Sequence, residues 1–225
     1  MTDDMDDKSA ACFVFPKWTN SVRPAVAAFV VVTPIYLILL LWYGASPRTL
    51  AVGYAPVQPV QYSHALHAGK LGLDCRYCHT TVESAAFAAL PATQTCMNCH
   101  IQILPDSPRL AAVRVSYETG MPLKWVKVHD LPQYVYFNHA AHLNAGVSCV
   151  SCHGRIDRME VVSQTEPLSM GWCLECHRRP EPHLRPKEFV TKLGWVSSED
   201  PVQLGAKLRK ENNIVPRTDC STCHR

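Results

Sequence analysis

The stretch Cys75-Arg76-Tyr77-Cys78-His79 sets the pattern of this 225-residue chain, because C-x-x-C-H occurs four more times. The five copies, called motifs 1 to 5, span residues 75–79, 96–100, 149–153, 173–177 and 220–224. Two cysteines followed directly by a histidine form the attachment sequence of c-type haem, in which the thiols bond the porphyrin edge and the histidine binds the iron. The sequence therefore predicts five covalently bound haem c groups.

The motifs assign a role to each of their cysteines and histidines. The predicted thioether cysteines are Cys75, Cys78, Cys96, Cys99, Cys149, Cys152, Cys173, Cys176, Cys220 and Cys223. The predicted proximal iron ligands are His79, His100, His153, His177 and His224. Zinc, an iron–sulfur cluster or disulfides are alternative uses of paired cysteines. None of these requires a histidine after every pair, so the pattern favours haem.

Length and composition predict an unusual core. With the N-terminal segment set aside, about 35 residues remain for each haem, too few for a separate apolar core around each one. We expect the haems themselves to form the core of a mainly α domain with much irregular loop. Seventeen prolines and ten glycines agree with this expectation. Residues 104–131 are interpreted as a connecting loop, and residues 184–216 as a short helix at 187–193 followed by a polar linker.

The formal net charge of +3 describes the chain without its cofactors. Each haem adds two propionate carboxylates, which make the loaded protein more negative. The sequence also contains no basic run and no nucleic-acid-binding motif. We therefore expect no nucleic-acid partner.

The N-terminal part predicts a membrane anchor. Residues 25–43 are 19 apolar or weakly polar residues, which as a helix would extend about 28 Å, enough for a bilayer core. A cleaved signal peptide is the alternative, but the start is acidic and no small-residue cleavage site follows closely. We expect a tail at residues 1–23, a transmembrane helix at 24–47 and a haem domain at 48–225.

The predicted orientation follows from haem chemistry. Bacteria attach haem to C-x-x-C-H outside the cytoplasmic membrane, whereas the charges flanking the span give only a weak bias. The chain is therefore predicted to be a single-pass protein of the bacterial inner membrane, with a cytoplasmic tail and a periplasmic haem domain.

An internal repeat precedes the first four motifs. Residues 62–67 (Y-S-H-A-L-H), called box 1, precede motifs 1 and 2, and residues 137–142 (F-N-H-A-A-H), called box 2, precede motifs 3 and 4. The repeat is therefore predicted to span residues 62–100 and 137–177. Motif 5, at residues 220–224, is an appended unit without its own box.

Six of the eleven histidines lie outside the motifs and are candidates for the sixth position of the irons. The predicted distal ligands are His64, His67, His129, His139 and His142. The alternates are His183, Met170 and Met159, and a methionine ligand would raise the reduction potential. If every iron has two protein ligands, none is open to substrate. We therefore predict electron transfer and no catalytic residue.

Three segments carry a resemblance to a known family. They are residues 64–79 (H-A-L-H-A-G-K-L-G-L-D-C-R-Y-C-H), 128–139 (V-H-D-L-P-Q-Y-V-Y-F-N-H) and 167–178 (P-L-S-M-G-W-C-L-E-C-H-R). Together they resemble the membrane-anchored pentahaem cytochrome c subunit of bacterial alternative complex III. The boxes more distantly resemble class III multihaem cytochromes.

The resemblance implies a place in a respiratory chain. Alternative complex III oxidises quinol and reduces a periplasmic cytochrome c or a terminal oxidase. The implied partners are an integral membrane quinol-binding subunit, a periplasmic Fe–S subunit related to molybdopterin enzymes, and a monohaem cytochrome c subunit. This chain would then be an electron relay. The alternatives are an autonomous small membrane-anchored quinol dehydrogenase and a multihaem reductase with an open catalytic haem.

Overall fold

The computed structural model describes residues 15–45 and 51–224. The chain divides into two units, Met1–Thr49 and Leu50–Arg225. Most of the predicted tail, including Cys12, the one cysteine outside the five motifs, lies outside the described residues.

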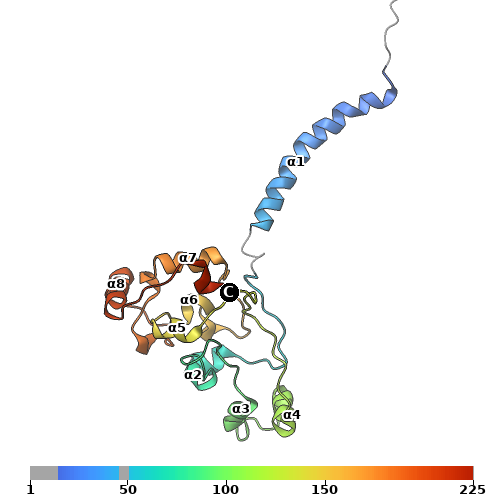
Figure 1. The fold of residues 1–225 in the computed structure, drawn as a ribbon. Helices are drawn as coiled ribbons and strands as arrows, with labels where there is room; N and C mark the ends of the chain where they lie inside the picture. Colours follow the sequence, from blue (N-terminus) through green and yellow to red (C-terminus); the bar gives the residue numbers. More distant parts are fainter. Residues whose placement is uncertain (1–14, 46–50, 225) are drawn as a thin grey trace, which may run out of the picture. The chain divides into compact units, whose positions relative to one another are not determined.

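The N-terminal unit contains one long helix. A 3-10 turn, η1 (Lys17–Ser21), leads into α1 (Val22–Gly44), which curves along its length (Figure 1). Residues 17–44 are long and apolar enough to cross a membrane by length and composition, and none of them is buried within the protein. Pro34 lies inside α1 and lacks the N–H that an uninterrupted helix would use. α1 begins two residues before the predicted span.

The second unit is built from short helices joined by irregular segments (Figure 1). In chain order these are η3 (Ala65–Lys70), α2 (Cys75–Cys78), α3 (Thr93–His100), η4 (Pro108–Leu110), α4 (Ala111–Thr119), α5 (His139–Asn144), α6 (Val150–His153), η5 (Ile156–Arg158), α7 (Met170–Arg178), η6 (Glu181–His183), η7 (Lys187–Phe189), α8 (Pro201–Glu211) and α9 (Cys220–Cys223). Between residues 51 and 224 there is no strand, only the isolated bridges Val135–His224 and Val147–Leu184. The prediction of a mainly α fold with much irregular loop is confirmed.

Polar side chains determine where several helices begin. Asp74 accepts a hydrogen bond from the Arg76 N–H at the start of α2, and Ser169 accepts one from the Trp172 N–H at the start of α7. α8 begins after Asp200, which caps two backbone N–H groups. Two motif-bearing helices therefore carry their own start signal in the residue before them.

Two sequence interpretations were wrong. The expected loop at 104–131 contains α4, whose Val113 and Ser116 are buried. The expected linker at 184–216 contains α8, where Gly205 lies so close to the Glu181 carbonyl that a Cβ would clash with it. Both helices pack against another element, α4 against α3 and α8 against η6, and local composition does not encode these contacts.

The apolar core is very small for a unit of this size. Among the described residues, seven hydrophobic side chains are buried: Val60, Val82, Val113, Leu143, Leu184, Val190 and Leu193. Three of these form one cluster: Val82, Leu143 and Val190. The apolar surface that these few side chains bury cannot by itself stabilise a unit of this length. The fold therefore has to rely on something other than side-chain packing.

The chain around Val190 joins the two copies of the repeat. The Ser148 hydroxyl donates to the Val190 carbonyl at 2.7 Å, next to motif 3. The Thr191 hydroxyl donates to the Asp74 carboxylate at 3.0 Å, next to motif 1. Motifs 1 and 3 are therefore held against the same short segment.

Candidate haem-binding site

Each motif folds as a helical turn that brings its three functional side chains to one side. In motifs 1, 3 and 5 the histidine N–H donates to the carbonyl of the first cysteine, at 2.8–2.9 Å. Residues three and four positions apart lie on the same face of a helical turn, so both thiols and the imidazole face the same space. None of the ten motif cysteines forms a disulfide. This is the geometry that attachment of a porphyrin by two thioethers requires.

Most of the imidazoles are oriented by a backbone carbonyl. Because a carbonyl can only accept, each of these rings carries its proton on Nδ1 and leaves Nε2 free to bind metal. The bonds are His67–Ser63, His79–Ala89, His100–Ile103, His139–Ala86, His142–Asn138, His177–Arg217 and His224–Tyr134, with lengths of 2.7–3.2 Å.

Three imidazole pairs have the spacing of two ligands on one iron. With metal–nitrogen bonds of about 2.0–2.1 Å, two rings on opposite sides of a metal have centres about 6 Å apart. The ring centres are 6.2 Å apart for His67–His100, 6.4 Å for His139–His153 and 6.0 Å for His142–His177. Each pair joins one box histidine to one motif histidine.

The remaining box histidine, His64, lies near motif 1. Burial first, and then the neighbouring His79 and His67, lower the pKa of His64 to about 4. Its Nδ1 is buried without a hydrogen-bond partner within the described residues. A neutral imidazole with an unused nitrogen is the state in which histidine binds a metal.

His129 lies beside motif 3. Its ring centre is 4.3 Å from that of His153, which is too close for an iron between the two rings. Its Nε2 is buried and has no partner within the described residues. Burial and the neighbouring His139 lower the pKa of His129, and burial followed by His129 lowers that of His153 to about 3. The structure thus places His129 in the histidine cluster of motifs 1 and 3.

Motif 5 is surrounded differently. The aromatic ring beside His224 is Tyr134, at 5.8 Å, and no histidine ring of the described residues contacts it. Of the alternates, His183 lies in η6, Met170 begins α7 and is 65% exposed, and the Met159 sulfur is 4.0 Å from the Ser163 hydroxyl.

The cysteines reveal which of the first three motifs are neighbours. Burial, and then the nearby Cys96 thiol, raise the pKa of Cys78, so motifs 1 and 2 are adjacent. A hydrogen bond between the Cys75 and Cys149 thiols lowers the pKa of Cys75, so motifs 1 and 3 are adjacent.

Cysteines also connect the last three motifs. Burial, and then Cys176 and Cys173, raise the pKa of Cys152 to about 12. Burial, and then Cys223, raise the pKa of Cys173. The motifs therefore form a continuous row in the order 2, 1, 3, 4, 5, which differs from their order in the sequence.

These observations fit covalent haem better than zinc. In the described part of the chain, no three His, Cys, Asp or Glu side chains gather around one point, as a zinc site requires. Ten unpaired thiols, three imidazole pairs at iron-spanning distances and two buried unpartnered imidazole nitrogens instead match haem attachment and axial ligation.

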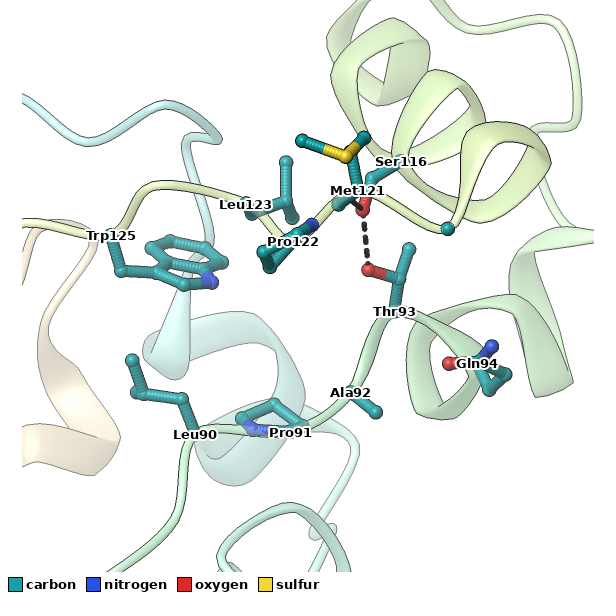
Figure 2. A pocket seen from close by; sticks show the side chains of 11 residues that line it. Leu90, Pro91, Ala92, Thr93, Gln94, Ser116, Met121, Pro122, Leu123 and Trp125 are labelled. Atoms are coloured by element: carbon teal, nitrogen blue, oxygen red, sulfur yellow. Dashed lines mark hydrogen bonds between the residues drawn. The ribbon is translucent and has the colours of Figure 1, made fainter.

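A separate pocket of about 310 Å³ lies between residues 90–94 and 120–125 (Figure 2). Leu90, Pro91, Pro122 and Trp125 contribute to its walls. The hydroxyls of Thr93 and Ser116 are hydrogen-bonded at 2.7 Å, as the dashed line in Figure 2 marks. The pocket contains none of the predicted ligands.

Comparison with known proteins supports the same class. Residues 135–225 match the family model described as cytochrome c7 and related cytochrome c. The mainly helical second unit is thus a multihaem cytochrome c domain. Over 97 residues the chain is 37% identical to the multihaem cytochrome c subunit of menaquinone reductase from Nitratidesulfovibrio vulgaris (strain Hildenborough). That match covers 43% of this chain and 45% of the relative.

Sequence reasoning did not identify the groups that orient the ligands. Backbone carbonyls such as those of Ala86, Ala89 and Arg217 carry no residue identity, so no sequence signal could reveal them. Tyr62 and Phe137 contact the box histidines, and here a signal existed. Both are aromatic residues two positions before the first histidine of a box.

Proposed function

We propose that this chain is a membrane-anchored, five-haem electron relay. The observation that carries the proposal is the continuous row of motifs, in which cysteines of successive motifs lie close enough to shift one another's pKa. Bound haem supplies one-electron chemistry at each motif. The protein keeps successive sites close together and provides paired, oriented imidazoles, an arrangement that favours transfer along the row over catalysis at one iron.

The proposed ligand pairs follow from the imidazole geometry. His67 pairs with His100, His139 with His153, and His142 with His177. For His79 there are two candidates within the same cluster, His64 and His129, and the repeat favours His64 because it corresponds to His139. For His224 the candidates are His183, Met170 and Met159.

The proposed partners follow from the resemblance to alternative complex III, and the similarity to a menaquinone reductase subunit supports a quinone-binding protein among them. Quinol oxidation releases two electrons and two protons, and we assign that step to an integral membrane subunit beside this chain. An Fe–S subunit passes the electrons on, and a periplasmic cytochrome c or terminal oxidase receives them. The apolar helix α1 supports membrane attachment, with the haem domain in the periplasm of a bacterium.

The test is mild detergent extraction of the full chain, followed by native electrophoresis, haem staining and identification of the companion subunits. A large assembly with an Fe–S subunit and a polytopic membrane subunit is the expected result. A lone haem-staining species reduced directly by quinol would identify an autonomous quinol dehydrogenase. Binding of cyanide or nitrite to a high-spin haem would instead indicate a reductase.

A further inference from the structure

In box 1, one aromatic ring contacts both histidines. The Tyr62 ring lies edge-on to His64, with ring centres 4.8 Å apart and planes at 87°. The same ring stacks on His67, with centres 4.4 Å apart and planes at 24°. Tyr62 is therefore in contact with the distal ligands proposed for two neighbouring haems.

Box 2 repeats this arrangement with a different residue. The Phe137 ring lies edge-on to His139 at 4.8 Å and 89°. It stacks on His142 at 4.4 Å and 27°. The two boxes thus agree to within a few degrees in both contacts.

Within the boxes the backbones are alike, because the N–H of the second histidine bonds to the carbonyl four residues back, His67 to Ser63 at 3.2 Å and His142 to Asn138 at 3.4 Å. The backbones differ beyond this shared turn. Box 1 leads into η3, a π-helix, with a bond from the Leu71 N–H to the Leu66 carbonyl. Box 2 leads into α5, an ordinary α-helix. The shared turn sets the spacing of the two histidines, and in each box one aromatic ring contacts both of them.

A stacked ring restricts rotation of the imidazole, and would do so when the imidazole holds a haem iron. The stacked histidines also donate Nδ1–H to a carbonyl, His67 to Ser63 at 2.9 Å and His142 to Asn138 at 2.8 Å. Two restraints, one at the face and one at the edge, then fix the plane of each ring. Groups that orient metal ligands also influence the reduction potential of the metal.

We propose that Tyr62 and Phe137 are positioning residues that fix the planes of the distal imidazoles, each for the two haems that its box serves. The inference goes beyond the relay and rests on the ligand pairs assigned under the proposed function. Orientation of axial imidazoles determines the EPR signature of low-spin ferric haem and contributes to its reduction potential. Each aromatic residue therefore influences the EPR signature and the reduction potential of one pair of haems.

The experiment compares Tyr62→Leu with Phe137→Leu in the full haem-loaded chain. EPR of the oxidised protein and a spectroelectrochemical redox titration are the readouts. Tyr62→Leu is expected to displace the low-spin signals of two haems, and Phe137→Leu those of two others. Tyr62→Phe and Phe137→Tyr are expected to keep the wild-type signal positions. Leu variants with five unmoved signals would overturn the proposal.

Phe189→Leu is the matched control. Phe189 stacks on Trp195 at 4.9 Å and contacts no histidine ring in the described residues. If this variant moves the same signals, general loosening of the domain explains the effect and the proposal fails. If a Leu variant does not fold, the conservative exchanges decide, because a displaced signal in Tyr62→Phe contradicts ring stacking as the cause.

The ligand assignment is tested separately by His67→Ala. A change of one haem to high spin in that variant, combined with unmoved signals in Tyr62→Leu, defeats the positioning role and leaves the relay intact. No change of spin state in His67→Ala defeats the assignment on which the inference rests.

Discussion

Residues 62–100 and residues 137–177 each contain one box and two motifs, yet they are supported differently. The second histidine of each box faces the second motif that follows it, with ring centres 6.2 Å apart for His67–His100 and 6.0 Å for His142–His177. Box 1 continues as the π-helix η3, whereas box 2 continues as the α-helix α5. Similar ligand geometry thus occurs with different helix types, although both boxes share the turn that bonds the second histidine to the carbonyl four residues back.

Motifs 1 and 3, which are the first motif of each repeat, also differ in their surroundings. Motif 1 begins at an exposed cap, where Asp74 accepts from Arg76. Motif 3 begins beside Ser148, which is 1% exposed and bonded to the Val190 carbonyl. Ligand spacing thus constrains the sequence closely, whereas the contacts that support each motif differ between the two halves.

The largest expected effect comes from removing a whole motif. The double change Cys149→Ser and Cys152→Ser abolishes attachment at motif 3, which contacts motifs 1 and 4 and the Val190 cluster. We expect little folded product at growth temperature. The matched change Cys96→Ser and Cys99→Ser removes motif 2, at the end of the row, and is expected to leave a folded four-haem protein.

Haem content and thermal unfolding of both double variants measure this difference. A motif 2 variant that is less stable than the motif 3 variant would contradict the position of motif 3 inside the row.

The next largest effect is expected from His67→Ala and His142→Ala. Each removes one proposed sixth ligand, so each should change one haem from low spin to high spin while five haems stay attached. EPR gives the spin state, and a pyridine haemochrome assay gives the haem count. If only one of the two variants changes, the halves are not equivalent in ligation.

Gly69 and Asn144 occupy corresponding positions, each five residues after the first histidine of its box. Substitutions there are expected to have a smaller effect on stability. A Cβ on Gly69 would clash with the Asp157 carbonyl, so Gly69→Ala should cost about 1–3 kcal/mol of the free energy of unfolding. The Asn144 side chain donates to the Glu83 carbonyl at 3.3 Å, so Asn144→Ala should cost about 0.5–1.5 kcal/mol at most. Denaturant unfolding of the haem-loaded variants measures both losses of free energy of unfolding. Equal losses in the two variants would argue against a close η3–η5 contact.

The smallest expected difference is between Asp74→Ala and Ser148→Ala, each about 1 kcal/mol at neutral pH. Hydrogen bonds from Arg76 lower the pKa of Asp74 to about 2. Its stabilisation is therefore complete above the ordinary carboxyl pKa of about 3.9 and is lost as the pH falls through about 2.

The Ser148 hydroxyl does not titrate, so its contribution should stay constant over the same range. Acid unfolding of the two variants against wild type measures this. A Ser148→Ala difference that also disappears in acid would show that both bonds depend on a common transition.

Motifs and boxes could be identified from sequence because haem attachment and axial ligation demand fixed residue types at fixed spacing. Their order in space could not be predicted. Motif 3 lies beside motif 1, not motif 2, and the contact runs through Cys75 and Cys149, 74 positions apart in the sequence. The segment at Val190 that holds both motifs acts through its backbone carbonyl and one hydroxyl, which composition does not distinguish from ordinary loop.

The same limit applies to His129. Its place ten residues before His139 suggested one more distal ligand, but only the fold puts its ring beside His153 and away from His224. The helices α4 and α8 were missed because each packs against another element, α3 and η6 respectively, and such packing leaves no signal in local composition.

The most direct measurement is an electron cryo-microscopy structure of the haem-loaded protein in its membrane complex, with each iron traced to its motif. We predict one continuous row of irons in the order 2, 1, 3, 4, 5, with the iron of motif 3 next to that of motif 1. A map in which the irons of motifs 2 and 3 are neighbours, or in which motif 5 is separated from motif 4, would contradict it.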